Sequence, residues 1–386
     1  MKRNVSGTFA GYALVPEVRA GSRRERDSAT MSHRTLPRLA AGLLAALSLA
    51  ITCIPHLGEG ATLPQPASAL QPLAGATNWM NSPALTPDAL RGKVVLLDFW
   101  TYSCINCLRT LPYVRAWATK YRPYGLVVIG VHTPEFDFER RPQNVQRATR
   151  DLAVDFPVVL DSDRSVWKAS GVYGWPTIDL IDARGMRRHR QEGEGGYVQA
   201  ERVIQQLLRE AGRTDVPTDL VAPVGAGTQA AVGTIPPQSG ETYVGAGRAE
   251  GFVAARGALR GGRAETFVPA PALHSGQWTL AGAWQVDDEY VQGREAGGSI
   301  AYRFRARDLH LVLGPSEDGR PVRFRIRIDG RVPAADHGTD VDADGEGRVD
   351  VHRLYQLVRQ GDAGRERLFE IQFLDPGVRA YAFTFG

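Results

Sequence analysis

The sequence predicts an α/β domain, with a central sheet covered by helices, followed by an all-β domain of the jelly-roll or sandwich type. Two patterns support this. Between residues 84 and 212, short apolar runs alternate with segments of helical period, which is typical of a buried sheet flanked by helices. After about residue 266, strand-length segments of period two are separated by turn signals, which is typical of an antiparallel sheet.

The elements of the α/β domain follow from its apolar segments. Strands are expected at residues 93–99, 125–131, 157–160 and 177–181. Helices are expected at residues 104–120, 138–153 and 197–211. The last helix carries one apolar face, made of Val198, Val203, Ile204, Leu207 and Leu208. Gly212 follows as a stop signal, so we place the end of the domain there.

The all-β domain is expected at residues 240–386. Its clearest strands lie at 302–305, 324–328, 369–373 and 381–385. The residues between their apolar positions are mainly charged, namely Arg303, Arg305, Arg323, Arg325, Arg327 and Glu370. One face of the strands is therefore predicted to be buried, and the other to be wet and largely cationic. Residues 213–239 are rich in Gly, Pro and Ala, so we expect a linker that does not couple the domains rigidly.

The N-terminal region has the features of an export signal. The chain has a formal charge of +4, yet its first 38 residues hold eight basic and three acidic residues, so the rest is close to neutral and nucleic-acid binding is not expected. An uncharged apolar run at 39–54 follows two arginines. We expect a signal peptide or a single signal anchor at 31–55, with the true start at Met31, an extension at 1–30 and a linker at 56–83. The chain is then exported to the periplasm or to the extracytoplasmic face of the inner membrane.

The chemistry is expected at a Cys-x-x-Cys motif, Cys104-Ile105-Asn106-Cys107, which lies where a buried strand gives way to a helix. Free backbone N–H groups and the partial positive charge of a helix N-terminus stabilise a thiolate at Cys104. Cys107, one turn later, is positioned to attack a mixed disulfide formed by Cys104. The motif therefore predicts a nucleophile and a resolving thiol. A purely structural disulfide is the alternative in an oxidising compartment.

The sequence gives little support for a zinc site or for haem attachment at this motif. The chain has three cysteines, and no second pair with ligand spacing completes a zinc site. Attachment of a c-type haem needs His directly after the second cysteine, and that residue is Leu108. We therefore expect no metal and no cofactor.

Together these residues resemble the thioredoxin superfamily. The strand ending Asp98-Phe99-Trp100, the Cys-x-x-Cys motif, Pro112 five residues later and the segment Trp175-Pro176-Thr177 all stand in thioredoxin register. The spacing between Cys104 and Pro176 leaves room for an extra helix and strand, as in the TlpA/redoxin branch. The resemblance implies a thioredoxin-like fold, a redox disulfide between Cys104 and Cys107, and a cis-proline at Pro176 that shapes the substrate groove.

The resemblance extends to DipZ-type proteins. The segments WTYSCINCLRTLPYVRAW and VHTPEF resemble their thioredoxin-like part, and ETYVGAGRAEGF and FLDPGVRAYAFTFG resemble their C-terminal module. The similarity covers roughly residues 84–386 and lacks the multi-helix membrane domain of those proteins. It implies that Asp98 handles the proton of the resolving thiol. We add Trp100, as packing against the active-site loop, and Glu135, as a carboxylate near the thiols.

The predicted function is an extracytoplasmic thiol–disulfide oxidoreductase. Its partners would be protein disulfides and dithiols of the cell envelope, and a membrane or soluble electron donor. One alternative is a thiol peroxidase, since Thr101 precedes Cys104 by three residues as in peroxiredoxins, although Leu97 stands where that family has proline. The other is an envelope- or carbohydrate-binding protein whose redox site is secondary, with ligand stacking on Trp278, Trp284, Tyr290 and Tyr355. Under the predicted oxidoreductase function, the C-terminal module is expected to be a docking or envelope-binding unit that raises the local concentration of clients near the redox domain.

Overall fold

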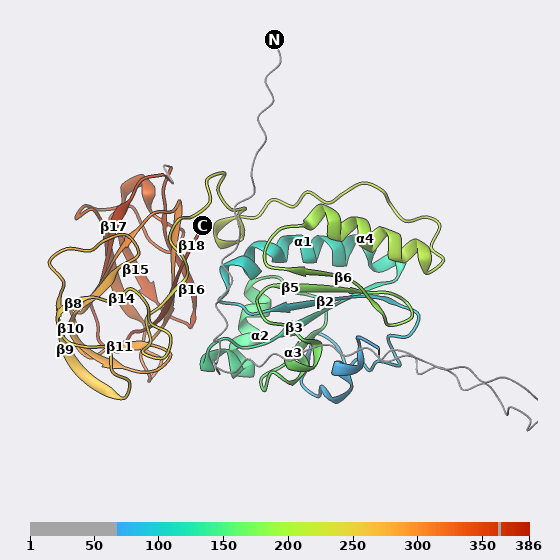
Figure 1. The fold of residues 1–386 in the computed structure, drawn as a ribbon, viewed down its shortest axis with the longest axis horizontal. Helices are drawn as coiled ribbons and strands as arrows, with labels where there is room; N and C mark the ends of the chain where they lie inside the picture. Colours follow the sequence, from blue (N-terminus) through green and yellow to red (C-terminus); the bar gives the residue numbers. More distant parts are fainter. Residues whose placement is uncertain (1–67, 362–363) are drawn as a thin grey trace, which may run out of the picture. The chain divides into compact units, whose positions relative to one another are not determined.

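The computed structural model describes residues 68–361 and 364–386 (Figure 1). The expected extension at 1–30, the export segment at 31–55 and residues 56–67 of the linker at 56–83 lie outside these residues. Within the described ranges, no helix is long and apolar enough to cross a membrane.

The first domain is built on a mixed six-stranded sheet in the order β1-β4-β3-β2-β5-β6. The central strands β2, β3 and β4 run parallel, β1 and β5 pair antiparallel with β4 and β2, and β6 pairs antiparallel with β5. The strands are β1 Trp79–Met80, β2 Val94–Trp100, β3 Leu126–His132, β4 Val158–Leu160, β5 Thr177–Ile181 and β6 Arg187–Glu192. The parallel strands are apolar runs because helices cover both faces of the sheet.

Two hydrophobic cores lie on the two faces of this sheet. The α-helices are α1 Ile105–Tyr121, α2 Pro142–Asp151, α3 Ser165–Ser170 and α4 Tyr197–Glu210, with 3-10 turns at η1 Gln71–Gly75, η2 Arg122–Tyr124 and η3 Asp137–Arg140. Buried side chains of α1, α2 and α4 share one core, and those of η1 and α3 share the other. Figure 1 shows α1 and α4 side by side on one face and α3 on the opposite face. This arrangement confirms the predicted thioredoxin-like fold.

The predicted elements differ from the structure in four places, the first of which is the short helix α3, which was not predicted. Residues 68–80, assigned to a linker, pack onto the sheet: Leu70 and Leu73 are buried, and β1 pairs with β4. Val198, placed on the apolar face of α4, is 61% exposed. The edge strand β6 was not predicted because its sequence is charged; Arg190 bonds to the buried Asp179 at 2.7 and 2.6 Å, so the charges are used within the sheet.

The second domain is an antiparallel twelve-stranded sheet within the described residues, so the all-β prediction is confirmed. Its main path is β15-β14-β17-β12-β10-β11-β18-β13-β16, with β7, β8 and β9 attached beside it. The strands are β7 Thr242–Tyr243, β8 Ala254–Arg256, β9 Arg263–Pro269, β10 Trp278–Val286, β11 Val291–Gly293, β12 Ser299–Phe304, β13 Asp308–Gly314, β14 Val322–Ile328, β15 Glu346–Val349, β16 Arg353–Arg359, β17 Arg367–Phe373 and β18 Arg379–Phe385. Single 3-10 turns lie at η4 Gly227–Gln229 and η5 Ala334–Asp336.

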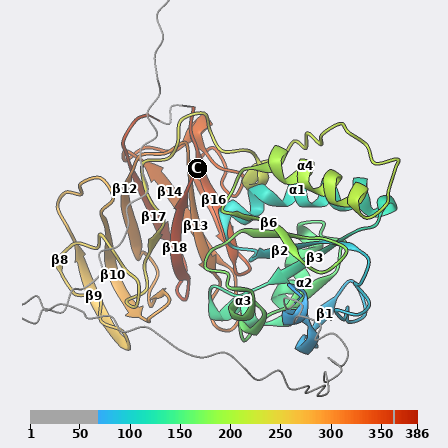
Figure 2. The same ribbon diagram turned by 45° about the vertical axis from the view of Figure 1, so that its right-hand side comes forward.

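The sheet folds over on itself at β10. The first half of β10 pairs with β12 and the second half with β9 and β11, and Gly282 between them has a φ of +92°, a conformation that favours glycine. Figure 2 shows β12, β14 and β17 in one layer and β13, β16 and β18 in the other. Their facing side chains form a single core. The antiparallel layers match the sandwich prediction, whereas the strand order of a jelly roll stays a prediction.

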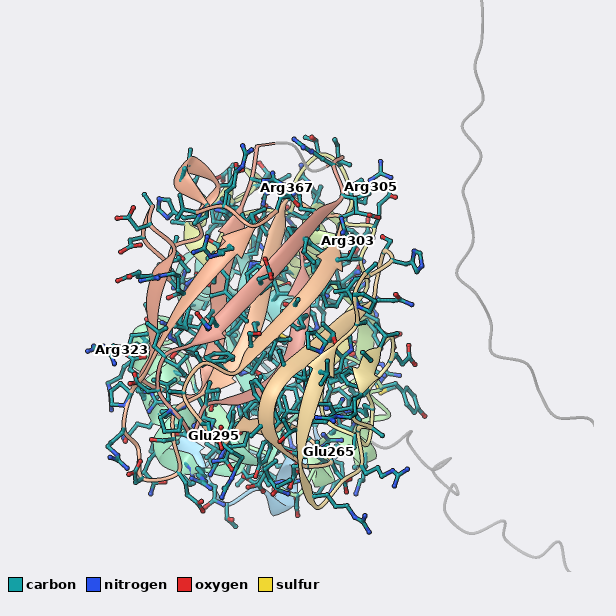
Figure 3. All side chains as sticks on the ribbon, turned by 90° about the vertical axis from the view of Figure 1, so that its left-hand side faces the viewer. Glu265, Glu295, Arg303, Arg305, Arg323 and Arg367 are labelled. Carbon is teal, nitrogen blue, oxygen red and sulfur yellow. The ribbon has the colours of Figure 1, made fainter. Side chains whose placement is uncertain are left out.

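The outer face of the β12–β14–β17 layer is wet, as predicted, and some of the arginines on it are paired with carboxylates. Burial alternates along these strands. Arg323 forms two bonds to Asp375, Arg325 pairs with Glu346, and Arg327 lies opposite Glu370. Figure 3 shows Arg303, Arg305 and Arg367 toward one end of this face and Glu265 and Glu295 toward the other. Carboxylates thus pair with Arg323 and Arg325 on this face.

The outer face of the β13–β16–β18 layer is not wet. Every residue of β13 is buried, and so are the inner residues of β16 and β18. Val312, Leu354, Tyr381 and Ala382 of this layer belong to the same core as α1, α2 and α4. The two domains therefore share a core, and the expectation of an independent docking module is wrong.

Residues 213–239 also bind the first domain instead of forming a loose linker. The Asp219 carbonyl accepts bonds from Lys120 and Gln205. The Val221 amide donates to Glu201 of α4, and Gln229 accepts from Arg115 of α1. The glycines and prolines of residues 213–239 therefore lie in a stretch of backbone that runs along α1 and α4.

The aromatic row proposed for carbohydrate stacking is mostly buried. Trp278, Trp284 and Tyr355 are among the largest fully buried side chains of the module. Tyr290 is half-buried and packs against Tyr381. No stacking face is left on these four rings, which removes the observation that favoured a carbohydrate-binding function.

We expect Tyr381→Ala to lower the free energy of unfolding by about 3 kcal/mol, because a large aromatic residue is removed from a packed core. Tyr381 contacts Phe136 and Phe138 of the first domain at 5.2 and 4.8 Å between ring centroids. Urea unfolding monitored by tryptophan fluorescence measures the change in the free energy of unfolding, and calorimetry shows whether the two domains unfold in one transition. Val332→Ala, at an exposed module residue, is the control. A loss confined to a separate module transition, with the first domain unaffected, would contradict the shared core.

Candidate functional site

Cys104 is the N-cap of α1. It follows β2 after a short turn, and its sulfur accepts the backbone N–H of Cys107 at 3.3 Å. The side chain is partly exposed, whereas Cys107 is buried, and both are free thiols. The disulfide implied by the resemblance is thus not formed in this structure. Cys104 has the geometry expected of a nucleophile, since it meets both solvent and the helix N-terminus.

Cys107 lies behind Cys104 in the core. Burial raises the pKa of the Cys107 thiol, and its hydrogen bond with Cys104 raises the pKa further, while a backbone bond from Thr101 opposes this. The inner thiol therefore resists losing its proton unless an acceptor is close by.

Asp98 supplies a carboxylate at that position. It is buried in β2, between Gly130 of β3 and Ile178 of β5. Burial raises the pKa of Asp98 to about 7, and its charge contributes to the raised pKa of Cys107. Its Oδ1 has no hydrogen-bond partner among the described residues. An unpartnered buried carboxylate is costly, and this one faces a thiol.

Trp100 and Thr101 belong to the core beneath the active-site turn. Trp100 packs edge-on against His132 at 5.4 Å and is 1% exposed. Its close approach requires Gly130, because a Cβ there would lie 2.9 Å from the indole nitrogen. The Thr101 hydroxyl lies 3.4 Å from His132 Nε2. Burial lowers the pKa of His132 to about 3, so this histidine is neutral.

The Trp175–Pro176 peptide is cis, as the resemblance implies. The segment that leads to it borders the same pocket as Cys104. This pocket has a volume of about 510 Å³ and is lined from the first domain by Cys104, Ile105, Asn106, Glu135, Tyr173, Gly174 and Trp175. Tyr173 is 89% exposed beside it. The second domain lines the opposite side, with Pro237, Ser239, Gly240, Glu241, Tyr243, Thr384 and Phe385.

Glu135 lies in this pocket, as expected from its place after β3, but its carboxylate is occupied. It accepts a bond from the Tyr243 hydroxyl at 2.5 Å and pairs with Arg248 at 3.1 Å. Glu241 shares the Tyr243 hydroxyl at 2.9 Å. Burial, and then the charge of Glu135, raises the pKa of Glu241 to about 7. The second domain therefore brings charged groups to the mouth of the site.

Glu139 is a site residue that the sequence analysis missed. Its carboxylate accepts the Ser103 hydroxyl at 2.6 Å on one oxygen and the amides of Glu135 and Phe136 at 2.6 and 3.1 Å on the other. Burial, and then Glu135, raises the pKa of Glu139 to about 7. One buried carboxylate thus joins the residue before Cys104 to the loop that contacts the module. A glutamate at the third position of the turn η3 was the available signal.

Arg109 was also missed. It lies in α1, two residues after Cys107, and is 4% exposed. Its guanidinium meets Glu194 at 3.5 Å and Asp308 of the module at 3.8 Å. Asp308 also pairs with Arg307 and Arg359 at 2.7 and 2.9 Å. A buried charge is costly unless it is paired. The ion pair between Arg109 and Asp308 therefore links α1 to β13.

Within the described residues, no group of three His, Cys, Asp or Glu side chains is arranged to hold a metal ion. The chemical groups gathered at the site are thus the two thiols, Asp98 and the pocket beside Cys104.

Family models match both domains. Residues 79–190 match the AhpC/TSA family, and residues 239–386 match the thioredoxin like C-terminal domain. The first domain is thus similar to AhpC/TSA proteins, and the second is similar to the C-terminal domain of thioredoxin-like proteins.

Two curated proteins are similar in sequence to this chain. Protein DipZ of Mycobacterium bovis is 34% identical over 286 residues, which is 70% of this chain and 39% of DipZ. The chain thus spans about two fifths of the length of DipZ. The thiol-disulfide oxidoreductase YkuV of Bacillus subtilis is 27% identical over 138 residues, 36% of this chain and 93% of YkuV. Among solved structures, a putative thioredoxin from Neisseria meningitidis aligns with a TM-score of 0.34 at 24% identity, covering 39% of this chain and 95% of its own.

Asp98→Asn should stabilise the protein at alkaline pH and leave it unchanged at acid pH. Because the pKa of Asp98 rises from 3.8 to about 7 on folding, the folded state holds its proton more tightly, and stability falls as pH rises across that interval. We expect a gain on the order of 2–4 kcal/mol at pH 8 and none near pH 4. Urea unfolding at both pH values measures it. The exposed Asp155→Asn is the control; an equal gain at both pH values would contradict a buried, titrating Asp98.

Proposed function

We propose that the protein is an extracytoplasmic thiol–disulfide oxidoreductase that exchanges disulfides with proteins of the cell envelope through Cys104 and Cys107. One observation carries the proposal. A partly exposed cysteine caps a helix, a buried cysteine lies one turn behind it, and the cis Trp175–Pro176 segment borders their pocket. The relatives named thiol-disulfide oxidoreductases support the same activity.

The reaction consists of two displacements. The Cys104 thiolate attacks one sulfur of a client disulfide; a mixed disulfide forms, and the second client sulfur leaves as a thiolate. The Cys107 thiolate then attacks the Cys104 sulfur and releases the first client sulfur. The client gains two electrons and becomes a dithiol, and Cys104 and Cys107 become a disulfide. The reverse sequence oxidises a client dithiol.

Asp98 is the proton acceptor that this scheme requires. Cys107 must lose its proton to resolve the mixed disulfide, and burial opposes that loss. Asp98 is buried beside it with a pKa of about 7, which suits exchange of a proton near neutral pH. Trp100 serves as core packing beneath the turn, and we assign Glu135 to holding Tyr243 of the module instead of to proton transfer.

The second domain forms one wall of the client pocket. Trp175, next to Pro176, and the exposed Tyr173 lie on the first-domain side, and Tyr243, Thr384 and Phe385 on the module side. A client segment that reaches Cys104 therefore contacts both domains. This arrangement gives the module a role in recognition at the active site itself.

The proposed compartment rests on the apolar run at 39–54, which follows two arginines and is typical of an export signal. Outside the cytoplasm the pair needs a separate electron donor or acceptor, in the membrane or soluble, because thiol–disulfide exchange only moves electrons between partners.

Single-cysteine variants test the mechanism. Cys104→Ser should abolish disulfide exchange, whereas Cys107→Ser should accumulate mixed disulfides through Cys104, because attack proceeds and resolution does not. Non-reducing gels and mass spectrometry of the trapped adducts measure this. Asp98→Asn should slow resolution more than first attack in stopped-flow assays. Adducts on Cys104→Ser and none on Cys107→Ser would reverse the two roles.

A thiol peroxidase is the second candidate, since the family model of the first domain is named for AhpC/TSA proteins and Thr101 precedes Cys104 by three residues. The local contacts favour it less. The Thr101 hydroxyl is directed to His132, and Leu97 is buried in the middle of β2, so the turn does not offer the proline of that family.

We expect Cys104 to react with hydrogen peroxide no faster than an ordinary low-pKa thiol, because Leu97 stands where peroxiredoxins have proline and Cys107 lies one turn behind Cys104. Stopped-flow tryptophan fluorescence gives the rate, and Cys104→Ser is the control. Oxidation at rates typical of dedicated peroxidases would promote the second candidate above the first.

A further inference from the structure

The pocket beside Cys104 is lined by charges of one sign. Its charged residues are Glu135 and Glu241, and no lysine, arginine or histidine belongs to its lining within the described residues. Glu135 comes from the first domain, after β3, and Glu241 comes from the second, directly before β7. A pocket with charges of one sign attracts groups of the opposite sign. The charge of a client segment is therefore expected to affect how readily it reaches Cys104.

The two carboxylates differ in how far they are neutralised. The side chain of Glu135 is 7% exposed and pairs with Arg248 at 3.1 Å, and this arginine also lies over the Tyr243 ring, 3.6 Å from its centroid. Glu241 is exposed, and its carboxylate accepts the Tyr243 hydroxyl at 2.9 Å. Within the described residues, no basic side chain forms an ion pair with Glu241. The unbalanced negative charge of the pocket is therefore that of Glu241.

The surroundings of Glu241 disfavour its charged form. Desolvation, and then the charge of Glu135, raises its pKa to about 7, and the Tyr243 hydroxyl and Arg248 oppose this rise. Glu135 faces it from the first domain, and Tyr243 and Arg248 face it from the second. A cation that entered the pocket would favour the charged carboxylate. Its attraction to Glu241 should consequently increase as the pH rises through 7.

The positions of the two walls limit which part of a client meets Glu241. Cys104 lies on the first-domain wall and Glu241 on the opposite wall, in a pocket of about 510 Å³. A sphere of that volume is about 10 Å across, the length of roughly three residues of extended chain at about 3.4 Å each. Successive side chains of an extended chain point to opposite sides. A client cysteine directed at Cys104 thus turns its immediate neighbours towards the wall that carries Glu241.

We infer that Glu241 selects clients that carry a lysine or arginine directly beside the cysteine that reacts with Cys104. This inference rests on the proposed exchange of disulfides and adds to it the chemistry of the client. Glu241 touches no reacting atom in this scheme, so it acts on the approach and orientation of the client segment. An ion pair in an open pocket is weak, and we expect a preference of about threefold over a neutral neighbour.

Short peptides test this on the reduced full chain. Each contains one cysteine in a disulfide with 2-nitro-5-thiobenzoate, and a lysine or a glutamine directly beside that cysteine. The Cys104 thiolate attacks the peptide sulfur, and nitrothiobenzoate leaves as a coloured thiolate. Cys107 then attacks Cys104, which leaves the two cysteines as a disulfide and the peptide as a thiol. Stopped-flow absorbance of nitrothiobenzoate gives the second-order rate constant for the first attack.

The ratio of the lysine rate to the glutamine rate is the decisive quantity, because the reactivity of Cys104 cancels in it. We expect a ratio of about three at pH 8 and low salt. It should fall towards one at pH 6, where Glu241 is mostly protonated, and at about 0.5 M salt, which screens the pair. Moving the lysine two positions from the cysteine should remove most of the preference, because its side chain then points to the other wall.

Variants assign the preference to Glu241. Glu241→Gln keeps an acceptor for the Tyr243 hydroxyl and should bring the ratio close to one at every pH. Glu295→Gln makes the same change of charge at an exposed residue outside the pocket lining (Figure 3), and should keep the parent's ratio. Equal rates for both peptides on the parent chain, or an unchanged ratio in Glu241→Gln, overturns the inference and leaves disulfide exchange in place. Release no faster than from Cys104→Ser, for every peptide, refutes the proposed function instead.

Discussion

The structure depends on the burial of one sheet face by the other domain. The outer side of the β13–β16–β18 layer presents Val312, Leu354 and Tyr381, and these side chains join the core of α1, α2 and α4. Phe136 and Phe138, which follow β3, stack on each other, and both pack at an angle against Tyr381. Apolar burial of this kind is the dominant favourable contribution to folding. Each domain therefore completes the hydrophobic core of the other.

That shared face reaches the thiols through a short series of contacts. Phe136, which packs on Tyr381, donates its amide to Glu139, and Glu139 accepts the Ser103 hydroxyl next to Cys104. On the other side of the motif, Arg109 is held by Asp308 of the module. The turn and the helix that present the cysteines are thus both fixed by groups that depend on the second domain. Precise positioning of a reactive group needs this kind of support around it.

Local features of the site were predictable from sequence, whereas its long-range partners were not. The junction of β2 and α1, with Cys104 as the helix N-cap, follows from an apolar run and a nearby motif. Glu139 and Arg109 contact residues that are distant in the sequence. The periodic pattern of apolar residues around them gives no sign of those contacts. The buried outer face was misread because alternation was taken from residues 302–305, 324–328, 369–373 and 381–385, and only the last of these lies in the buried layer. In β13 the sequence DLHLVLG is nearly continuous in apolar residues, which is typical of a strand covered on both faces.

The two cysteines differ in burial, since Cys104 is partly exposed and Cys107 is buried. Cys104 meets the pocket and the helix N-terminus, so it is the thiol that a client can reach. Cys107 is enclosed, and its raised pKa keeps the proton in place until an acceptor takes it. Asp98 is also buried, and its pKa of about 7 is a product of desolvation. In the mechanism that we propose, exposure selects Cys104 as the attacking thiol, and burial matches Cys107 to Asp98 as its base.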